Sequence, residues 1–159
     1  MPDVFPFEPL NFPRPDAMKT RPAEGRPVVR GEKINAPRFE VLCVVRKKWV
    51  LLEPEEWVRQ HLVHHLVELG WPLGRTTVEM PVKFGQARGR IDVAILDEQG
   101  RPALIAECKA PSVALSQATL DQLGRYQLDA GAPHLIATNG KQHLVWENGR
   151  PASQFPRAS

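Results

Sequence analysis

Three residues with side chains suited to metal-assisted hydrolysis lie within one short segment of the sequence. Asp92 lies in the first of two apolar runs, and Glu107 and Lys109 lie at the end of the second. The polar stretch between the runs, centred on Gln99-Gly100, predicts a β-hairpin. If these two residues form the turn, Asp92 stands opposite Glu107, with Cβ atoms roughly 5 Å apart. Alternation along the strand then places Lys109 on the same face as Glu107.

Two carboxylates at such a short distance indicate a bound cation. They repel each other unless one is protonated or a cation lies between them. Oxygen ligands without a neighbouring His or Cys pair favour Mg²⁺ or Mn²⁺ over Zn²⁺. Such an ion would activate water and stabilise the charge of a phosphodiester transition state, while Lys109 holds the water or the phosphate. The alternative for this spacing alone is a surface hairpin whose charged side chains are merely solvated.

The composition indicates one folded domain. The chain has 159 residues, of which 42% are hydrophobic, with a formal net charge of +3 and a pI near 9.1. This basic excess is compatible with a nucleic-acid partner without requiring one. Cys43 and Cys108 lack the spacing of a metal-binding pair, so we expect free thiols, with Cys108 buried in a strand, and a cytoplasmic location. The sequence predicts neither an export signal nor a membrane span.

Proline marks the first part of the chain. Eight of the 16 prolines fall within residues 1–38, which are expected to form an extended, proline-rich N-terminal arm. The domain is assigned to residues 39–148, and residues 149–159 are expected to be a C-terminal tail. The arm carries bulky residues that we expect to pack on their own domain, with docking on a partner as the alternative: Phe5, Phe7, Leu10 and Phe12.

A helix is predicted over residues 54–69. A proline suits its first turn, Glu55 and Glu56 lie near the positive end of its dipole, and Gly70 ends it. On helical spacing Glu55 falls on the inward face and Glu56 at the flank. The inward carboxylate is either an ion-pair partner of Arg59 at i, i+4 or a third carboxylate of the metal site. The apolar face consists of Val58, Leu62, Leu66 and Leu69.

The remaining elements predict a mixed sheet flanked by helices. A strand is expected over residues 76–84, where Pro81 indicates an edge position or a bulge. The hairpin follows, and then a helix at about residues 116–130. Apolar runs at residues 133–138 and 143–146 predict further strands. The fold class is therefore α/β or α+β, with a helix, three strands, a helix and one or two strands in order.

Several segments of the chain resemble a known family. The D…ExK hairpin and the helix that follows it, with its QxxxY motif, resemble the PD-(D/E)XK nuclease superfamily. The segments PEEWVRQHL, ELGWP, ECKAPS, DQLGRY and ATNG are similar to the N-terminal nuclease domain of type I restriction enzyme R subunits and to small stand-alone relatives. The resemblance covers roughly residues 39–148. It implies a restriction-endonuclease-like core with the order αβββαβ and metal-dependent hydrolysis of phosphodiester bonds in DNA.

The resemblance also implies roles for individual residues. Asp92, Glu107 and Lys109 would be catalytic, and Glu55 would join the two hairpin carboxylates in binding Mg²⁺ or Mn²⁺. The Pro-Asp pair of the superfamily is absent, because Ile91 precedes Asp92. Such a departure puts little of the assignment in doubt.

Substrate contacts are expected from two parts of the chain. Gln122 and Tyr126 match the motif of the second helix and share one face of it, so both could reach a phosphate or a base. Ordinary packing is the alternative. Arg88 and Arg90, just before the hairpin aspartate, and Lys48, in an earlier basic cluster, could follow a DNA backbone. The alternative for these basic residues is a solvated charged turn.

Other motifs limit the range of functions. No GxxxxGK[ST] phosphate-binding loop is present, so we expect the chain to act alone or with a separate motor or recognition subunit, and a homodimer is also compatible. The alternative function is a non-catalytic DNA- or partner-binding module that keeps the nuclease fold. Three histidines of the first helix lack the partners of a zinc site and are expected to be structural or exposed: His61, His64 and His65.

Overall fold

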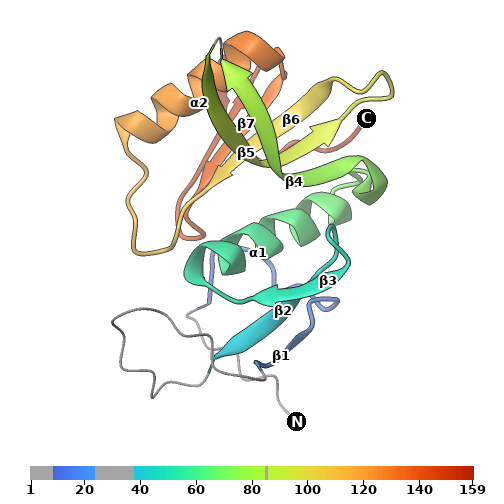
Figure 1. Cartoon of the computed structure of the whole chain (residues 1–159). Coiled ribbons are helices and arrows are strands. Elements are labelled where there is room, and N and C mark those ends of the chain that lie inside the picture. The colour runs from blue at the N-terminus through green and yellow to red at the C-terminus, as the bar shows by residue number, and fades with distance from the viewer. Residues whose placement is uncertain (1–8, 24–37, 85) are drawn as a thin grey trace.

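Two β-sheets enclose one helix of the protein. The computed structural model describes residues 9–23, 38–84 and 86–159, and within these it leaves out the side chains of residues 84, 87 and 126–130. Figure 1 shows the helix α1 (Pro54–Glu68) between a small sheet and a larger one, and the helix α2 (Gln117–Ala130) against the larger sheet. A short 3-10 turn, η1 (Leu73–Arg75), follows α1.

The larger sheet has six strands and mixed polarity. Its strands lie in chain order, and only the pair β6–β7 is parallel, with α2 as the crossover between them. The small sheet is antiparallel throughout. The small sheet consists of β1 (Thr20–Pro22), β2 (Phe39–Cys43) and β3 (Lys48–Leu51). The six-stranded sheet consists of β4 (Thr76–Phe84), β5 (Ala87–Leu96), β6 (Pro102–Cys108), β7 (His134–Thr138), β8 (His143–Glu147) and β9 (Arg150–Ala152).

The predicted fold class is confirmed, since helices flank a mixed sheet and the order from α1 onward follows the expected sequence of elements. The strand with Pro81 is the edge strand of the larger sheet, as its proline indicated. The small sheet and β9 are additions to the predicted order. Their strands are short, and the proline content of the first segment concealed one of them.

The helix α1 is buried on two sides. Val58 and Leu62, on the predicted apolar face, pack into the core against the six-stranded sheet. Trp57 packs on the opposite side with Val41 and Leu52 from the region of the small sheet. Periodicity identifies one apolar face correctly, but it does not reveal a second sheet that covers another side with polar and aromatic contacts. The helix ends as predicted at a glycine with a positive φ of 97°.

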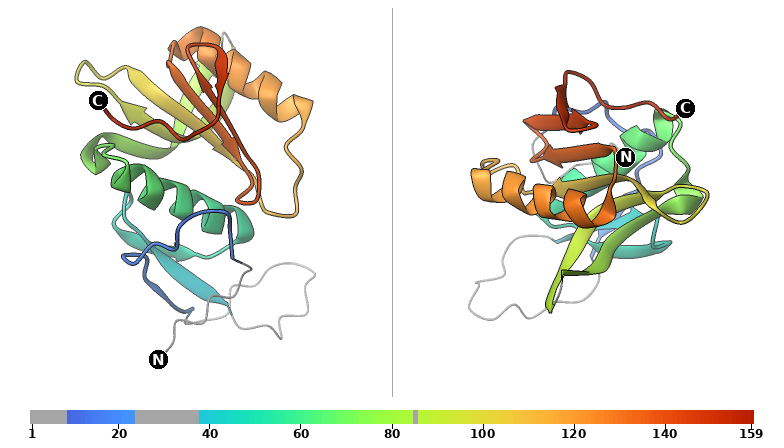
Figure 2. Two further views of the ribbon diagram at one scale, coloured as in Figure 1. Left: turned by 180° about the vertical axis from the view of Figure 1, so that it is seen from behind. Right: turned by 90° about the horizontal axis from the view of Figure 1, so that it is seen from above.

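Both ends of the described chain pack on α1 and its surroundings (Figure 2, left view). Phe12 is buried, and its ring stacks on that of Phe155 with centroids 5.6 Å apart. The indole of Trp71 donates a hydrogen bond to the Pro156 carbonyl at 2.9 Å. The folded unit therefore extends beyond residues 39–148 at both ends. Phe5 and Phe7 of the arm lie outside the described residues, and Leu10 packs against the same core as Phe12.

Two further expectations concern the cysteine thiols and a membrane-spanning helix. Cys43 and Cys108 are both free, and Cys108 is buried, as predicted; Cys43 is buried as well. Burial, followed by the negative charge of Asp92, raises the pKa of the Cys108 thiol well above its ordinary value. Among the described helices, none combines the length and the apolar character needed to cross a membrane.

Candidate active site

The hairpin formed by β5 and β6 holds the two carboxylates at its open end. The register pairs Val93 with Ala106, so the next position outward brings Asp92 opposite Glu107. Lys109 follows β6 directly, and its ammonium lies 3.3 Å from a Glu107 carboxylate oxygen. The structure thus brings together the three side chains whose spacing suggested a catalytic site.

The turn of this hairpin differs from the predicted one, although the register is the same. The amide of Asp97 donates to the Arg101 carbonyl at 2.7 Å, which makes the loop three residues long instead of two. Gly100 has the positive φ (80°) that such a loop requires at its last position. The resulting offset of one residue is removed by a bulge where the register shifts between Ile95 and Leu96.

The strands β5 and β6 separate at the carboxylates. The Lys109 amide donates to Thr138 of β7 at 2.8 Å, so alternation along β6 directs the Cys108 amide toward β5. That amide donates to the Asp92 carboxylate at 2.8 Å, in place of a backbone carbonyl. The side chain of Asp92 therefore closes the ladder and is held beside Glu107 where strand pairing ends.

Glu107 is an incompletely compensated buried carboxylate. It is only 6% exposed. Burial, followed by repulsion from Asp92, raises the pKa of Glu107 to about 7, although Lys109 partly opposes the shift. Burial on its own would lower the pKa of Lys109, but the charge and hydrogen bond of Glu107, together with the charges of Glu55 and Asp92, raise it. Near neutral pH the carboxylate pair can therefore accept either a proton or a metal cation.

The first turn of α1 brings a third carboxylate and an arginine to the site. The guanidinium of Arg59 lies 3.5 Å from a Glu55 oxygen and 3.6 Å from an Asp92 oxygen. Burial and then the charge of Asp92 raise the pKa of Glu55, and the charge of Glu55 in turn contributes to the raised pKa of Glu107. Glu55 therefore pairs with Arg59 and also lies within electrostatic reach of both hairpin carboxylates.

The prediction that Glu56 lies at the flank of the helix is wrong. Its side chain is 10% exposed, whereas that of Glu55 is 46% exposed. One Glu56 oxygen accepts hydrogen bonds from Arg46 and Arg59, each at 2.8 Å, and the other accepts one from Gln60 at 3.2 Å. The turn after β2 supplies Arg46 and covers this side of the helix, which periodicity within the helix could not indicate. We call Arg46, Glu56 and Arg59 the arginine–glutamate network.

Glu79, at a distortion in β4, connects this network to the six-stranded sheet. Arg46 also donates to Glu79 at 2.9 Å, and Arg90 lies 3.8 Å from the other Glu79 oxygen. Glu79 has a φ of 52°, an uncommon conformation for a residue with a side chain, and the register of β4 with β5 passes over it. Sequence reasoning placed Arg46 in a basic cluster that could follow a DNA backbone and did not predict its contacts with Glu56 and Glu79, because these depend on a turn, a helix and a distorted strand at once.

The predicted substrate residues lie on different elements of the fold. Arg90 precedes Asp92 by two positions in β5. Gln122 is half-buried on α2, which packs on β6 and β7. The side chain of Tyr126 lies outside the described part of the chain. Lys48 is exposed at the start of β3 in the small sheet, whereas Arg90 lies in β5 of the larger sheet.

The histidines do not form a metal centre. Within residues 9–23, 38–84 and 86–159, no three His, Cys, Asp or Glu side chains converge closely enough to form a metal-binding group. His61 and His64 are buried on α1, and a ring nitrogen of His61 lies 2.8 Å from the Trp57 carbonyl oxygen. Their packing agrees with the structural role expected for them.

Comparison with known proteins identifies a family that the chain matches. Residues 54–156 match the family described as "Type I restriction enzyme R protein N terminus". The fold is similar to a fragment of a putative HsdR subunit of a type I restriction enzyme from Vibrio vulnificus YJ016, with a TM-score of 0.51 and 20% identity over 67% of this chain and 24% of that one. The chain therefore spans about a quarter of that protein. No curated protein matches the chain. Since the matched residues make up more than half of the sequence, the chain belongs to the family of type I restriction enzyme R protein N-terminal domains.

Proposed function

We propose that the protein is a metal-dependent nuclease that hydrolyses phosphodiester bonds in DNA. The observation that carries the proposal is the buried Glu107 carboxylate, which faces Asp92 and has Lys109 beside it as a countercharge. Membership of a restriction-enzyme family supports the same chemistry. On this basis we also propose a separate motor or recognition subunit as a partner.

The donor set fits a hard divalent cation. Proteins usually hold Mg²⁺ through one or two carboxylates, and waters and substrate phosphates complete its coordination. Asp92 and Glu107 would supply these carboxylates, and Glu55 would add charge nearby. A bound Mg²⁺ or Mn²⁺ supplies Lewis-acid activation of water and of the phosphate. The raised pKa of Glu107 supports the fit, because a cation relieves the same repulsion that a proton otherwise relieves.

The protein's own residues orient and stabilise the reacting groups. The Cys108 amide holds Asp92, and Arg59 limits the position of the same carboxylate from the helix side. The raised pKa of Lys109 keeps it cationic at neutral pH, so it serves as an electrostatic donor to the phosphate or the attacking water and not as a general base. Gln122 and Tyr126 are proposed substrate contacts on α2.

A second function is favoured by one feature of the site. Arg59 lies near Asp92 and Lys109 lies near Glu107, so each carboxylate already has a basic neighbour. In a non-catalytic binding module these ion pairs would be purely structural. The distinction rests on metal binding, because a binding module has no need of Mg²⁺ or Mn²⁺ at the hairpin.

Calorimetric titration with Mn²⁺, combined with cleavage of plasmid DNA, separates the two functions. Wild-type protein should bind Mn²⁺ and cleave, and Glu107→Gln should lose both properties. Glu98→Gln provides the control, because Glu98 is an exposed carboxylate in the turn of the same hairpin. Cleavage that persists in purified Glu107→Gln protein, or wild-type protein without Mn²⁺ binding, would contradict the nuclease proposal.

A further inference from the structure

The strands β4 and β5 extend beyond the rest of the six-stranded sheet. The register of β5 with β6 begins at Val93, whereas the pairing of β4 with β5 continues outward to Phe84 and Ala87. Beyond Asp92 the sheet is therefore reduced to two strands, residues 80–84 and 87–91, which we call the ribbon. Figure 2 (right view) shows this ribbon projecting from the sheet.

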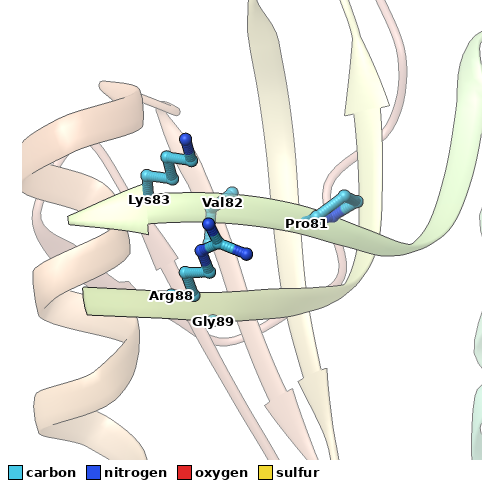
Figure 3. A pocket seen from close by; sticks show the side chains of 5 residues that line it. All are labelled: Pro81, Val82, Lys83, Arg88 and Gly89. Carbon is cyan, nitrogen blue, oxygen red and sulfur yellow. The ribbon is translucent and has the colours of Figure 1, made fainter. Parts of the chain in front are cut away.

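The ribbon presents two basic side chains at one position. Lys83 pairs with Arg88 in the register, so the two side chains share a face, as Figure 3 shows. Like charges directly opposite each other destabilise a sheet. Both residues are exposed, and in the described part of the chain neither forms an ion pair with an acidic side chain. Folding alone gives no reason for this pair, so the arrangement fits an anionic partner.

A hollow accompanies the two charges. It has a volume of about 420 Å³, and Figure 3 shows the side chains that line it. It lies over two successive register pairs, Val82 with Gly89 and Lys83 with Arg88. The glycine contributes no side chain to fill it. The surface at this end of the ribbon is thus concave and carries two basic side chains, which suits a sugar–phosphate backbone.

The basic face continues toward the carboxylates. Positions 88 and 90 share a face of β5 by alternation, and Arg88 lies roughly 13 Å from Asp92 along the strand at about 3.3 Å per residue. Arg90 contacts Glu79, and Glu79 contacts Arg46 of the arginine–glutamate network beside Asp92. The charges of the ribbon therefore lead directly to the candidate active site.

We propose that the ribbon binds the backbone of a DNA duplex next to the bond to be cleaved, with Lys83 and Arg88 on phosphates. This inference rests on the proposed nuclease function and names a surface that holds its substrate. A two-stranded β-ribbon has a size that the major groove of B-DNA admits. At a rise of about 3.4 Å per nucleotide, the 13 Å from Asp92 to Arg88 corresponds to roughly four base pairs.

Equilibrium binding of a short labelled duplex in EDTA, over a series of salt concentrations, tests the proposal without catalysis. The variant is Lys83→Gln/Arg88→Gln. The control is Arg101→Gln/Arg150→Gln, which removes the same charge from two exposed positions outside the ribbon. The ribbon variant should lose roughly tenfold in affinity at low salt, and its plot of log K against log salt should become shallower by about 1.8, because each lost phosphate contact removes about 0.9. The control should stay near wild type in both.

The same proteins are then assayed for cleavage in Mn²⁺ and for melting temperature. The melting temperature of the ribbon variant should equal or exceed that of wild type, because both positions are exposed and the substitutions remove two opposed like charges. If wild-type protein cleaves DNA while the ribbon variant keeps wild-type affinity and KM, the ribbon inference fails and the nuclease proposal stands. Equal losses of DNA affinity in both double variants would show that net charge alone accounts for the effect, which would also overturn the inference. Wild-type protein that neither binds nor cleaves the duplex would overturn both proposals.

Discussion

Two buried glutamates of the protein lie near each other in the fold but in opposite electrostatic environments. Glu56 accepts hydrogen bonds from Arg46, Arg59 and Gln60. Glu107 faces another carboxylate and has Lys109 close by. Buried charges are stable when they are paired and hydrogen-bonded, and they are costly otherwise. The comparison indicates that Glu56 contributes to the stability of the fold, whereas Glu107 is held at a cost to stability, which fits the proposed catalytic role.

Glu56→Gln should give the largest loss of stability. The substitution leaves two arginines near each other without their shared carboxylate, and breaking a buried ion pair typically costs about 3–5 kcal/mol. Urea denaturation monitored by circular dichroism measures the loss. Glu53→Gln is the control, because Glu53 is exposed one residue before α1. A loss below about 1 kcal/mol would show that the network is not structural and would remove the contrast with Glu107.

Glu107→Gln should have the opposite effect on stability. Without metal at pH 8 it removes an ionised buried carboxylate that Asp92 repels, so the free energy of unfolding should rise by about 1–3 kcal/mol. Addition of Mn²⁺ should stabilise the wild type and leave the variant unchanged. Thermal melts with and without Mn²⁺ provide the measurement. If the variant is less stable than wild type without metal, Glu107 belongs in the same structural class as Glu56.

The pH dependence sharpens this contrast. The folded pKa of Glu107, about 7, lies above its ordinary value of 4.5, so folded protein binds more protons than unfolded protein between these values. Its ionisation therefore lowers wild-type stability as the pH rises from about 5 to 8. The stability gap between Glu107→Gln and wild type should widen over that interval, as urea titrations at each pH would show. A gap that stays constant would contradict the raised pKa.

The stability of Glu107→Gln must be compared with that of wild type at each pH, because the buried histidines change stability with pH in the direction opposite to Glu107. Burial lowers the pKa of His61 and of His64. Both proteins therefore lose stability as the pH falls below the unfolded value of about 6.5. Subtracting the wild-type curve from that of the variant removes this shared contribution.

Glu55→Gln should give the smallest change in stability. Its ion pair with Arg59 is half-exposed, so the loss should stay below about 1 kcal/mol. Its charge lies near both hairpin carboxylates, so Mn²⁺ affinity should still fall several-fold in calorimetric titration. Glu68→Gln, an exposed position at the other end of α1, should leave the affinity unchanged. Unaltered affinity in Glu55→Gln would make this residue an ion-pair partner only.

Local patterns predicted much of this arrangement. The position of Asp92 opposite Glu107 follows from strand alternation and hairpin pairing, both of which act over a few residues. Pro81 indicated the edge strand, because a proline cannot donate to a neighbouring strand. The side of α1 that carries Glu56 was predicted wrongly, since its burial depends on Arg46 from an earlier turn. Long-range contacts of this kind leave no periodic signal in the sequence.

The bulge near the end of the β5–β6 hairpin has a consequence for changes in chain length. It places one unpaired residue, Ala103, between the register pairs Leu96–Pro102 and Ile95–Leu104. Deleting Ala103 would leave the three-residue loop joined to two regular strands, with Val93 still opposite Ala106. The hairpin can therefore lose one residue at its closed end while the carboxylates at its open end keep their places. A deletion in β5 between Asp92 and the bulge would instead turn the Asp92 side chain to the opposite face of the sheet.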